Sequence, residues 1–314
     1  MSQITRDFLS LNDINRDEAR HILEVSRFLK TGPRDTQHSL LRGRSVAIVL
    51  EKPSTRTRVS FELGITQLGA YPVVLLSEGS QLGRGEPIRD TARVLARYCD
   101  AIVFRTTTTA RLNEMAGCGV PVLNALSDDG HPVQVLSDVF TIEEAFAESG
   151  KNGAIEGRTI AFVGDGSSNM ARSWVRAAKL FGFRLRIGAP EGYAPPADEV
   201  AASGGLVTVY NDPVRAVEGA EVVNTDVWTS MGQEVETGLR LSAFDGWTVN
   251  EALMAKAGPG AIVLHCLPAH RGEEIDAATL EGPRSRVWVQ AENRLHVQKG
   301  LLCWCLGVAH NVRG

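Results

Sequence analysis

The chain has 314 residues, of which 43% are hydrophobic, and its formal net charge at pH 7 is −4. This length is enough for two domains with buried cores, and the acidic balance argues against a protein that binds nucleic acid. No apolar run is long enough for a membrane helix and no apolar signal-peptide core follows the first residues, so we expect a cytoplasmic protein that binds no membrane. The five cysteines form no Cys-x-x-Cys pair, so we expect a reducing compartment and neither a disulfide framework nor a zinc site. We expect no other metal and no cofactor.

The first half of the chain is predicted to alternate between helices and short buried strands. Apolar spacing predicts a helix over residues 57–69, and the glycine at its end is typical of a helix C-terminus. A proline at the first position favours a helix that begins at Pro132 and continues to about residue 149. The other helices predicted here span 5–30 and 86–98, and the strands span 45–50, 73–76, 101–104 and 120–124.

A glycine-rich break at residues 150–153 predicts a domain boundary, after which the alternation of strands and helices starts again. The predicted strands are 159–163, 185–188, 206–209, 221–224 and 261–265, and the predicted helices are 170–181 and 291–308. This pattern predicts an α/β fold of two similar-sized domains, each with a mostly parallel sheet flanked by helices. We expect domains at 1–149 and 150–291, with the C-terminal helix (292–314) packing back on the first domain.

Five polar residues, Ser54, Thr55, Arg56, Thr57 and Arg58, lie between a predicted strand and the helix after it. Unpaired N–H groups at a helix N-terminus favour an anion, the hydroxyls add donors, and arginine adds a fork suited to phosphate. The pattern predicts a phosphate site, and the simpler alternative is a helix cap with two solvated arginines.

Two further groups in the first half are candidates for the same anion. Arg105 follows a predicted strand, at the edge where α/β sheets bind ligands, although a surface ion pair is the alternative. His131 and Gln134 open the next helix, whose positive end disfavours protonation of the imidazole. A neutral His131 could donate to a ligand oxygen, or it could simply cap the helix.

In the second half, residues 164–169 nearly match the dinucleotide fingerprint Gly-x-Gly-x-x-Gly. Asn169 replaces the third glycine, which permits close helix–strand packing in dinucleotide-binding folds, and no acidic residue follows at the usual spacing. These two differences argue against an NAD-dependent dehydrogenase. Asn169 could instead present its amide to a polar ligand, and a plain tight turn is the remaining alternative.

Three segments near the ends of later elements are candidates for a second substrate. Asp226 follows a strand and could hold a cationic amine. We expect Trp228 in the same loop to be exposed, and the alternative is a loop folded onto the core by its own tryptophan. Cys266 ends the last strand, as a polar thiol donor or as a buried structural cysteine. Arg294 offers one more fork for phosphate.

Taken together and in this order, the motifs resemble the aspartate/ornithine carbamoyltransferase family over nearly the whole chain. The segment 54–58 is similar to its carbamoyl phosphate motif, and His-Cys-Leu-Pro at 265–268 is similar to the ornithine type, since aspartate members have proline in place of Cys266. Two positions depart from the usual pattern, Pro87 and Ser168. The resemblance implies transfer of a carbamoyl group to the δ-amine of ornithine, which gives citrulline and phosphate in arginine metabolism.

The resemblance also implies residue roles. Carbamoyl phosphate would be bound by Ser54, Thr55, Arg56, Thr57, Gln81, Arg105, His131, Gln134, Cys266, Leu267 and Arg294. Ornithine would be bound by Leu126, Asn169, Asp226, Ser230 and Met231. Catalysis would fall to Arg56, Arg105, His131, Asp226 and Cys266. The family assembles as a homotrimer, in which Gln81 would reach the site of a neighbouring subunit.

Other functions remain as alternatives at this point. A related enzyme could use putrescine, acetylornithine or aspartate, but Cys266 disfavours aspartate and residues 230–232 disfavour the other two. A dinucleotide-binding oxidoreductase has the partial fingerprint as its only support. A catalytically silent relative is disfavoured because Arg56, Arg105, His131, Asp226 and Cys266 are all present.

Overall fold

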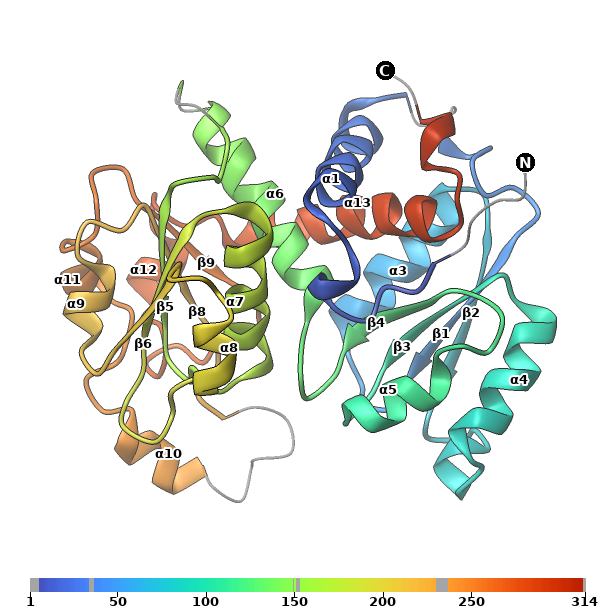
Figure 1. Cartoon of the computed structure of the whole chain (residues 1–314), viewed down its shortest axis with the longest axis horizontal. Coiled ribbons are helices and arrows are strands. Elements are labelled where there is room, and N and C mark those ends of the chain that lie inside the picture. The colour runs from blue at the N-terminus through green and yellow to red at the C-terminus, as the bar shows by residue number, and fades with distance from the viewer. Residues whose placement is uncertain (1–5, 34–36, 149, 151–152, 230–236, 313–314) are drawn as a thin grey trace. The chain divides into compact units, whose positions relative to one another are not determined.

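The computed structural model describes residues 6–33, 37–148, 150, 153–229 and 237–312 (Figure 1). The chain divides into two compact units, Met1–Leu136 with Asn293–Gly314, and Ser137–Glu292. Helices α6 (Pro132–Glu148) and α13 (Val287–Cys305) each contain residues of both units. This division falls inside α6, earlier than the glycine-rich break at which the sequence predicts a boundary.

The first unit is built on a four-stranded sheet in the order β2-β1-β3-β4, in which all neighbouring strands are parallel. Its strands are β1 (Ser45–Leu50), β2 (Tyr71–Leu76), β3 (Ala101–Arg105) and β4 (Val122–Leu126). The central strand β3 is buried at every position, as expected when helices cover both faces of a parallel sheet. In this register Leu50 lies beside Arg105, so the carboxyl ends of β1 and β3 meet at one edge.

Helices cover both faces of this sheet. Side chains of α4 and α5 pack with Ala47, Val49, Ile102 and Phe104 on one face, whereas α1, α3 and α13 lie together on the other side (Figure 1). The helical segments here are η1 (Leu11–Asp13), α1 (Arg16–Thr31), α3 (Thr55–Gln67), η2 (Leu82–Arg84), α4 (Ile88–Tyr98), α5 (Thr109–Met115) and η4 (Ala309–Asn311).

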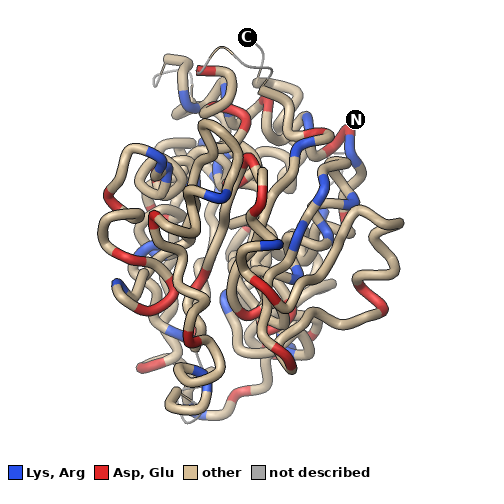
Figure 2. Tube along the Cα trace, turned by 90° about the vertical axis from the view of Figure 1, so that its left-hand side faces the viewer, with Lys and Arg blue, Asp and Glu red and all other residues tan. Residues whose placement is uncertain are grey.

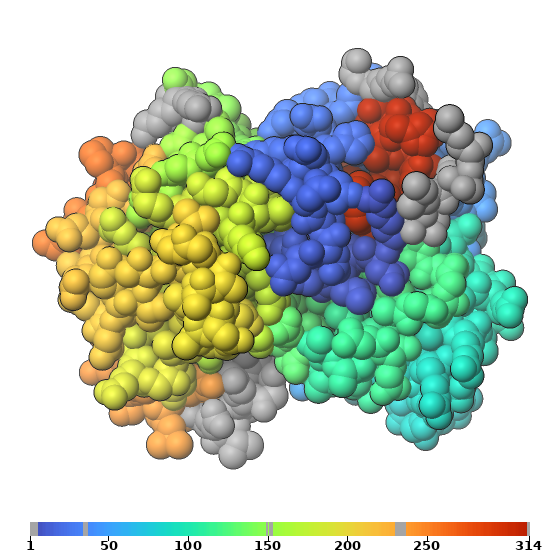
Figure 3. Space-filling model, in the orientation of Figure 1, coloured from blue at the N-terminus to red at the C-terminus, as the bar shows by residue number. Residues whose placement is uncertain are grey.

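The C-terminal helix packs closely against α1. A Cβ atom at Gly300 would come within 2.3 Å of Ser26 Oγ and 2.9 Å of Ile22 O, so the contact requires a residue without a side chain. Lys299 Nζ donates to the Leu29 carbonyl at 3.2 Å in the same contact. The space-filling view shows the C-terminal residues beside the N-terminal segment at the surface of this unit (Figure 3).

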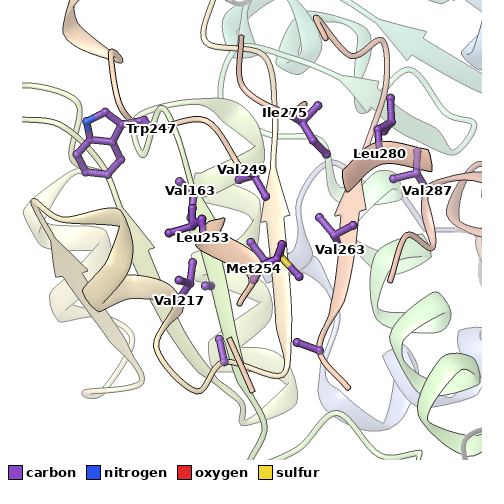
Figure 4. Close-up of a cluster of buried hydrophobic side chains, with 14 of the residues drawn as sticks. Val163, Val217, Trp247, Val249, Leu253, Met254, Val263, Ile275, Leu280 and Val287 are labelled. Atoms are coloured by element: carbon purple, nitrogen blue, oxygen red, sulfur yellow. The ribbon is translucent and has the colours of Figure 1, made fainter. Parts of the chain in front are cut away.

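The second unit has a five-stranded parallel sheet in the order β7-β6-β5-β8-β9. Its strands are β5 (Thr159–Val163), β6 (Arg184–Gly188), β7 (Val207–Tyr210), β8 (Val222–Thr225) and β9 (Ile262–His265). Its helices are α7 (Asn169–Phe181), α8 (Ala197–Ala201), α9 (Pro213–Val217), α10 (Thr237–Ala243), α11 (Glu251–Met254) and α12 (Ala277–Glu281). Figure 4 shows a core cluster in which Val163 and Val263 of the sheet pack with Val217, Leu253 and Leu280 of the helices.

The structure confirms the predicted α/β class and the nine predicted strands, with small shifts of their ends. The first helix begins at Arg16 rather than near residue 5, because Asn15 and Glu18 form a capping box there. The last helix begins at Val287, four positions before the predicted start. Short helices such as α9 were not predicted, although Asp212 followed by Pro213 is a recognisable start signal.

Among the described residues, no helix combines the length and the apolar character that a membrane crossing requires. Basic and acidic residues are both scattered along the Cα trace (Figure 2). This mixture agrees with the small net charge of the chain.

Candidate functional site

The N-terminus of α3 forms the centre of a polar cluster in the first unit. Ser54 is its N-cap, and its Oγ accepts the Thr57 N–H at 3.3 Å. The Ser54 and Thr57 hydroxyl oxygens are 3.0 Å apart, and Thr57 is fully buried. Thr55 and Arg56 occupy the first turn, where backbone N–H groups have no acceptor within the helix. The local geometry therefore presents donors to an anion, as the sequence predicts.

Two arginines far apart in the sequence meet at the same hydroxyl. Arg105 Nη1 and Arg294 Nη2 each lie 3.3 Å from Thr57 Oγ1, which accepts a hydrogen bond from both. Both guanidinium groups belong to buried residues, with 7% and 4% of the surface of Arg105 and Arg294 exposed. Two buried like charges are costly unless an anion balances them. The cluster is thus suited to a phosphate or a carboxylate group.

His131 lies in the positive field of this cluster. Burial is the main cause that holds the pKa of its imidazole well below the usual range, and Arg294, Arg105 and Arg56 lower it further. His131 is therefore neutral at pH 7 and can act as a hydrogen-bond donor from one ring nitrogen. The predicted neutral state is confirmed, but burial and the arginines account for it rather than the helix terminus alone. Gln134, one turn along α6, is also buried.

A second layer of contacts supports the strand ends that carry these groups. Glu51 follows β1 and accepts hydrogen bonds from Arg111 Nε at 3.0 Å and from the Thr106 hydroxyl, directly after Arg105. Burial alone would raise the pKa of Glu51, but the bonds from Arg111 and Thr106 and the Arg111 charge hold it below the usual value. No local sequence pattern predicts this ion pair, because Glu51 and Arg111 are 60 positions apart.

The second unit places Asp226 beside Cys266 at the carboxyl ends of adjacent strands. Cys266 Sγ donates to Asp226 Oδ1 across 3.1 Å, and the Val227 N–H donates to the same oxygen at 2.8 Å. Burial raises the pKa of Asp226, although His265, Cys266 and the Val227 N–H act in the opposite direction. The thiol is therefore a polar donor in this structure and not only a packing group.

The turn after β9 is held by buried polar side chains that the sequence analysis did not single out. The Leu267 N–H donates to His265 Nδ1 at 2.9 Å, so the proton of a neutral ring lies on Nε2, which is 2.9 Å from Glu274 Oε1. The Leu267–Pro268 peptide bond is cis, and Leu267 has a φ of 60°. A non-glycine residue in this left-handed region is uncommon and marks candidate functional sites.

The other predicted substrate ligands that the structure describes lie on elements that the two clusters above do not include. Leu126 is the last residue of β4 and Asn169 is the first residue of α7. Gln81 is exposed at the start of η2 in the first unit. The predicted ornithine ligands Ser230 and Met231 lie outside the described residues.

The expectation that Trp228 is exposed is wrong. Its side chain is 4% exposed and stacks on Phe244, with 5.4 Å between the ring centroids. The large apolar ring enters the core of the second unit, and burial of its apolar surface stabilises the loop that begins at Asp226. The alternative of a loop folded onto the core by its own tryptophan therefore describes this segment.

Among the described residues of the second unit, two groups of side chains have potential metal-ligand atoms within 4.8 Å of one another. One is Asp226 with His265 and Cys266, and the other is His270 with Glu273 and Glu274. In the first group both ring nitrogens of His265 are already engaged, by Leu267 and Glu274. That imidazole cannot bind a metal through either nitrogen without losing one of these bonds. The geometry favours a hydrogen-bonded proton network over a metal centre.

Comparisons with known families match both halves of the chain. Residues 6–144 match the aspartate/ornithine carbamoyltransferase carbamoyl-P binding domain, and residues 156–305 match the Asp/Orn binding domain of the same family. An ornithine carbamoyltransferase of Sorangium cellulosum is 64% identical over 305 residues, which cover 96% of this chain and 98% of the relative. One from Geobacter sulfurreducens is 49% identical over 305 residues, with coverages of 95% and 98%.

Solved structures agree in fold. The ornithine carbamoyltransferase from Pyrococcus furiosus is 42% identical and superposes with a TM-score of 0.88, covering 98% of this chain and 99% of the other. The anabolic ornithine carbamoyltransferase from Campylobacter jejuni is 36% identical, with a TM-score of 0.87 and coverages of 98% and 100%.

Proposed function

Because the chain belongs to the aspartate/ornithine carbamoyltransferase family, we propose that it transfers the carbamoyl group of carbamoyl phosphate to the δ-amine of L-ornithine. The products are L-citrulline and phosphate, and the setting is arginine metabolism in the cytoplasm. The observation that carries the proposal is the meeting of Arg105 and Arg294 at the buried hydroxyl of Thr57. Such a cluster favours a phosphorylated substrate over an uncharged one.

Carbamoyl phosphate is assigned to the groups around the start of α3. In this proposal Arg56 and the α3 N-terminus neutralise the phosphate, while Arg105, His131 and Thr57 donate to the carbamoyl oxygen. Negative charge grows on that oxygen as the tetrahedral intermediate forms, and fixed donors stabilise it. The other proposed ligands of carbamoyl phosphate are Ser54, Thr55, Gln134 and Arg294, with Gln81 from a neighbouring subunit and the backbone at Cys266 and Leu267.

Ornithine is assigned to Asp226, Cys266, Asn169 and Leu126, with Ser230 and Met231 outside the described residues. A primary amine with a pKa near about 10 is mostly protonated at pH 7, so the site must favour its neutral form. Asp226 and Cys266 would orient the amine and assist loss of its proton. The amine nitrogen then bonds to the carbamoyl carbon, and the bond from that carbon to the phosphate oxygen breaks. Phosphate leaves with the electron pair and accepts the second proton, which the nitrogen loses after it has attacked.

We assign carbamoyl phosphate to the N-terminal domain, completed by the C-terminal helix, and ornithine to the following domain. We also propose a homotrimer. Its support is a set of exposed apolar residues on α3, β2 and α4 of the first unit, among which Tyr71 is 77% and Tyr98 is 74% exposed. The other exposed apolar residues on these elements are Val59, Leu63, Val73, Leu76 and Val94.

Sedimentation analysis tests the trimer. Replacing Leu63, one of these exposed apolar residues, by lysine should shift the protein toward smaller species, because burying a lysine in an apolar contact is costly. The matched control is Leu239→Lys on α10 of the second unit, where the leucine is 75% exposed. A monomeric unmutated protein would contradict the trimer, as would an equal effect of both substitutions.

An acceptor panel tests the reaction. Purified protein is supplied with carbamoyl phosphate and with ornithine, putrescine, acetylornithine or aspartate in turn, and the carbamoylated product is measured. We expect the kcat/KM for ornithine to exceed that of every other acceptor by at least about 10³-fold, since a site built for a charged group rejects substrates that lack it. Product with another amine and none with ornithine would overturn the substrate assignment.

A further inference from the structure

The side chain of Arg240 joins two segments that carry proposed ornithine ligands. Arg240 lies on α10, and its Nη1 donates to Asp165 Oδ2 at 2.6 Å and to the Trp228 carbonyl at 2.9 Å. The arginine is 5% exposed and Asp165 is 2% exposed, so this ion pair is buried. One guanidinium nitrogen thus connects the turn after β5 with the loop after β8.

The Asp165 carboxylate is used on both oxygens. Its Oδ1 accepts the Ser167 N–H at 2.9 Å and the Ser167 hydroxyl at 2.6 Å, while Oδ2 accepts from Arg240. These bonds fix the turn that leads into α7, whose first residue is Asn169. Both oxygens of the Asp165 carboxylate therefore stabilise the local structure. Asp165 lies four positions before Asn169, a proposed ligand of ornithine.

The two segments that Arg240 connects also approach each other directly, at Gly164. Gly164 has a φ of 137°, and a Cβ atom there would lie 3.7 Å from Asp226 O, from Thr225 Oγ1 and from Trp228 Cδ1. The Thr225 hydroxyl also donates to Val163 O at 2.7 Å. Small shifts of either segment would therefore change where Asp226 lies relative to Asn169.

We propose that Arg240 is a positioning residue for ornithine, which holds the Asp226 segment and the Asp165–Asn169 turn in register through its bonds to Trp228 O and Asp165. The proposal rests on the proposed function only in the identity of the ligand. Arg240 bonds to the Asp165 carboxylate and to the Trp228 carbonyl, so it acts on the two ornithine ligands through the segments that carry them. Lysine offers a donor nitrogen and a positive charge but no planar guanidinium to lie beside the Tyr193 ring, so it should replace Arg240 only in part.

Aromatic packing supports this role for the arginine. Arg240 Cζ lies 5.1 Å from the ring centroid of Tyr193, and Tyr193 packs against Phe244, with 4.8 Å between their centroids. Phe244 in turn stacks on Trp228. The guanidinium therefore lies against a cluster of aromatic rings as well as its two polar partners, and these contacts limit its alternative conformers.

The chain offers a matched control at the opposite ends of the same strands. Arg158 Nη1 pairs with Glu221 at 2.5 Å, its Nε donates to the Ala154 carbonyl at 2.8 Å, and its Cζ lies 3.9 Å from the Phe146 ring centroid. Arg158 thus makes the same kinds of contact as Arg240 in the same unit. A general loss of stability should follow from either substitution, whereas an effect on ornithine should follow only from Arg240.

The experiment compares the steady-state kinetics of Arg240→Ala, Arg240→Lys, Asp165→Asn and Arg158→Ala. We expect Arg240→Ala to raise the KM for ornithine about 10- to 100-fold, with the KM for carbamoyl phosphate changed less than about twofold. Arg240→Lys should recover part of this loss, and Asp165→Asn added to Arg240→Ala should cost little more than either alone. An unchanged ornithine KM in folded Arg240→Ala would overturn the proposal, as would an equal rise in Arg158→Ala.

A second readout does not depend on the substrate. Hydrogen exchange of the backbone amides at 164–169 and 226–229 should be faster in Arg240→Ala than in Arg158→Ala, relative to the unmutated protein. If Arg240→Ala does not fold, Asp165→Asn tests the same link, and unchanged exchange in both segments would overturn the proposal. If the unmutated protein shows no reaction with ornithine but amide exchange is still faster in Arg240→Ala, the structural link is supported and the proposed function is not.

Discussion

Arg294 Nη2 donates to Thr57 Oγ1 across 3.3 Å, although 237 positions of the chain separate the two residues. Thr57 lies in the first turn of α3, and Arg294 lies in α13 near the C-terminus. The contact shows that the first unit is completed by residues from the end of the chain. It also concentrates positive charge at one buried hydroxyl in a protein whose net charge is −4.

Loss of Arg56 should remove most turnover. Arg56→Gly takes away a guanidinium proposed to neutralise the phosphate, and we expect kcat/KM for carbamoyl phosphate to fall about 10²- to 10³-fold. Arg58 is the matched control, because it lies two positions along the same helix and pairs with Glu62 at the surface. Steady-state rates should change less than about twofold in Arg58→Ala. Similar losses in both variants would contradict the role of Arg56.

The Thr57 hydroxyl can be removed with little change of shape. Thr57→Val removes the hydroxyl oxygen that accepts hydrogen bonds from both Arg105 and Arg294. The two buried positive charges then repel each other without this shared acceptor. We expect the unfolding free energy to fall by about 1–3 kcal/mol and the affinity for carbamoyl phosphate to fall about tenfold. Calorimetry measures both the unfolding free energy and the affinity for carbamoyl phosphate. Thr57→Ser keeps the hydroxyl and should match the unmutated protein in both quantities. Equal effects of valine and serine would show that packing matters rather than the hydroxyl.

The lowered pKa of His131 predicts a sensitivity of the fold to acid. The folded state binds a proton at this ring less readily than the unfolded state, whose histidine pKa is about 6.5. Stability is therefore fully present above that value and is lost as the pH falls from it toward the folded pKa, by up to about 1.4 kcal/mol per pH unit. Urea unfolding of His131→Asn should show a shallower loss between pH 6.5 and 5. Identical pH slopes in both proteins would contradict a buried neutral imidazole.

The raised pKa of Asp226 predicts a conflict between activity and stability. As the pH rises above about 3.9, Asp226 ionises in the unfolded chain before it ionises in the folded protein, where burial raises its pKa. The folded state is therefore less stable at neutral pH than it would be without this buried charge. Asp226→Asn should therefore unfold at a higher temperature than the unmutated protein at pH 7, with the difference shrinking toward pH 4. Its kcat/KM for ornithine should fall at least about 10²-fold. A variant that loses stability at pH 7 would contradict the electrostatic cost.

The thiol of Cys266 should matter through its proton. Cys266→Ser retains a donor for Asp226 Oδ1, whereas Cys266→Ala removes it, so ornithine kinetics should be impaired more by alanine. We expect a further rise of about 3- to 10-fold in the KM for ornithine on going from serine to alanine, since one intramolecular hydrogen bond contributes about 0.5–1.5 kcal/mol. The control is Cys118→Ala in the first unit, at a partly buried cysteine. Equal kinetics in the serine and alanine variants would contradict the donor role.

Elements with strong local signals could be predicted from the sequence. The strands around Val163 and Val103 are continuous apolar runs, and Pro132 marks the first residue of α6, as the structure confirms. Short capped helices were missed because five to seven residues show no clear period. The exposed position predicted for Trp228 was wrong because no local feature of a loop reveals which core its side chain can reach.

The candidate site was predictable where motifs carry the chemistry and not where distant partners do. Residues such as Thr57 and Asp226 follow strands and stand out by type, whereas Glu51 with Arg111 and Asp165 with Arg240 are pairs across 60 and 75 positions. The roles of the site residues remain predictions. The protonation of His131 shows the difference, because helix position alone predicts its direction, while burial and three arginines are its physical causes.

One measurement tests the central claim most directly. Carbamoyl phosphate labelled with ¹³C in the carbamoyl group is mixed with excess protein and L-ornithine, and the product is followed by NMR in a single turnover. We predict that the label appears in a ureido group on the δ-nitrogen, as in L-citrulline, with release of one phosphate, and that Arg56→Gly slows this step. Label that stays in carbamoyl phosphate, or that appears only as hydrolysis products, would contradict carbamoyl transfer to ornithine.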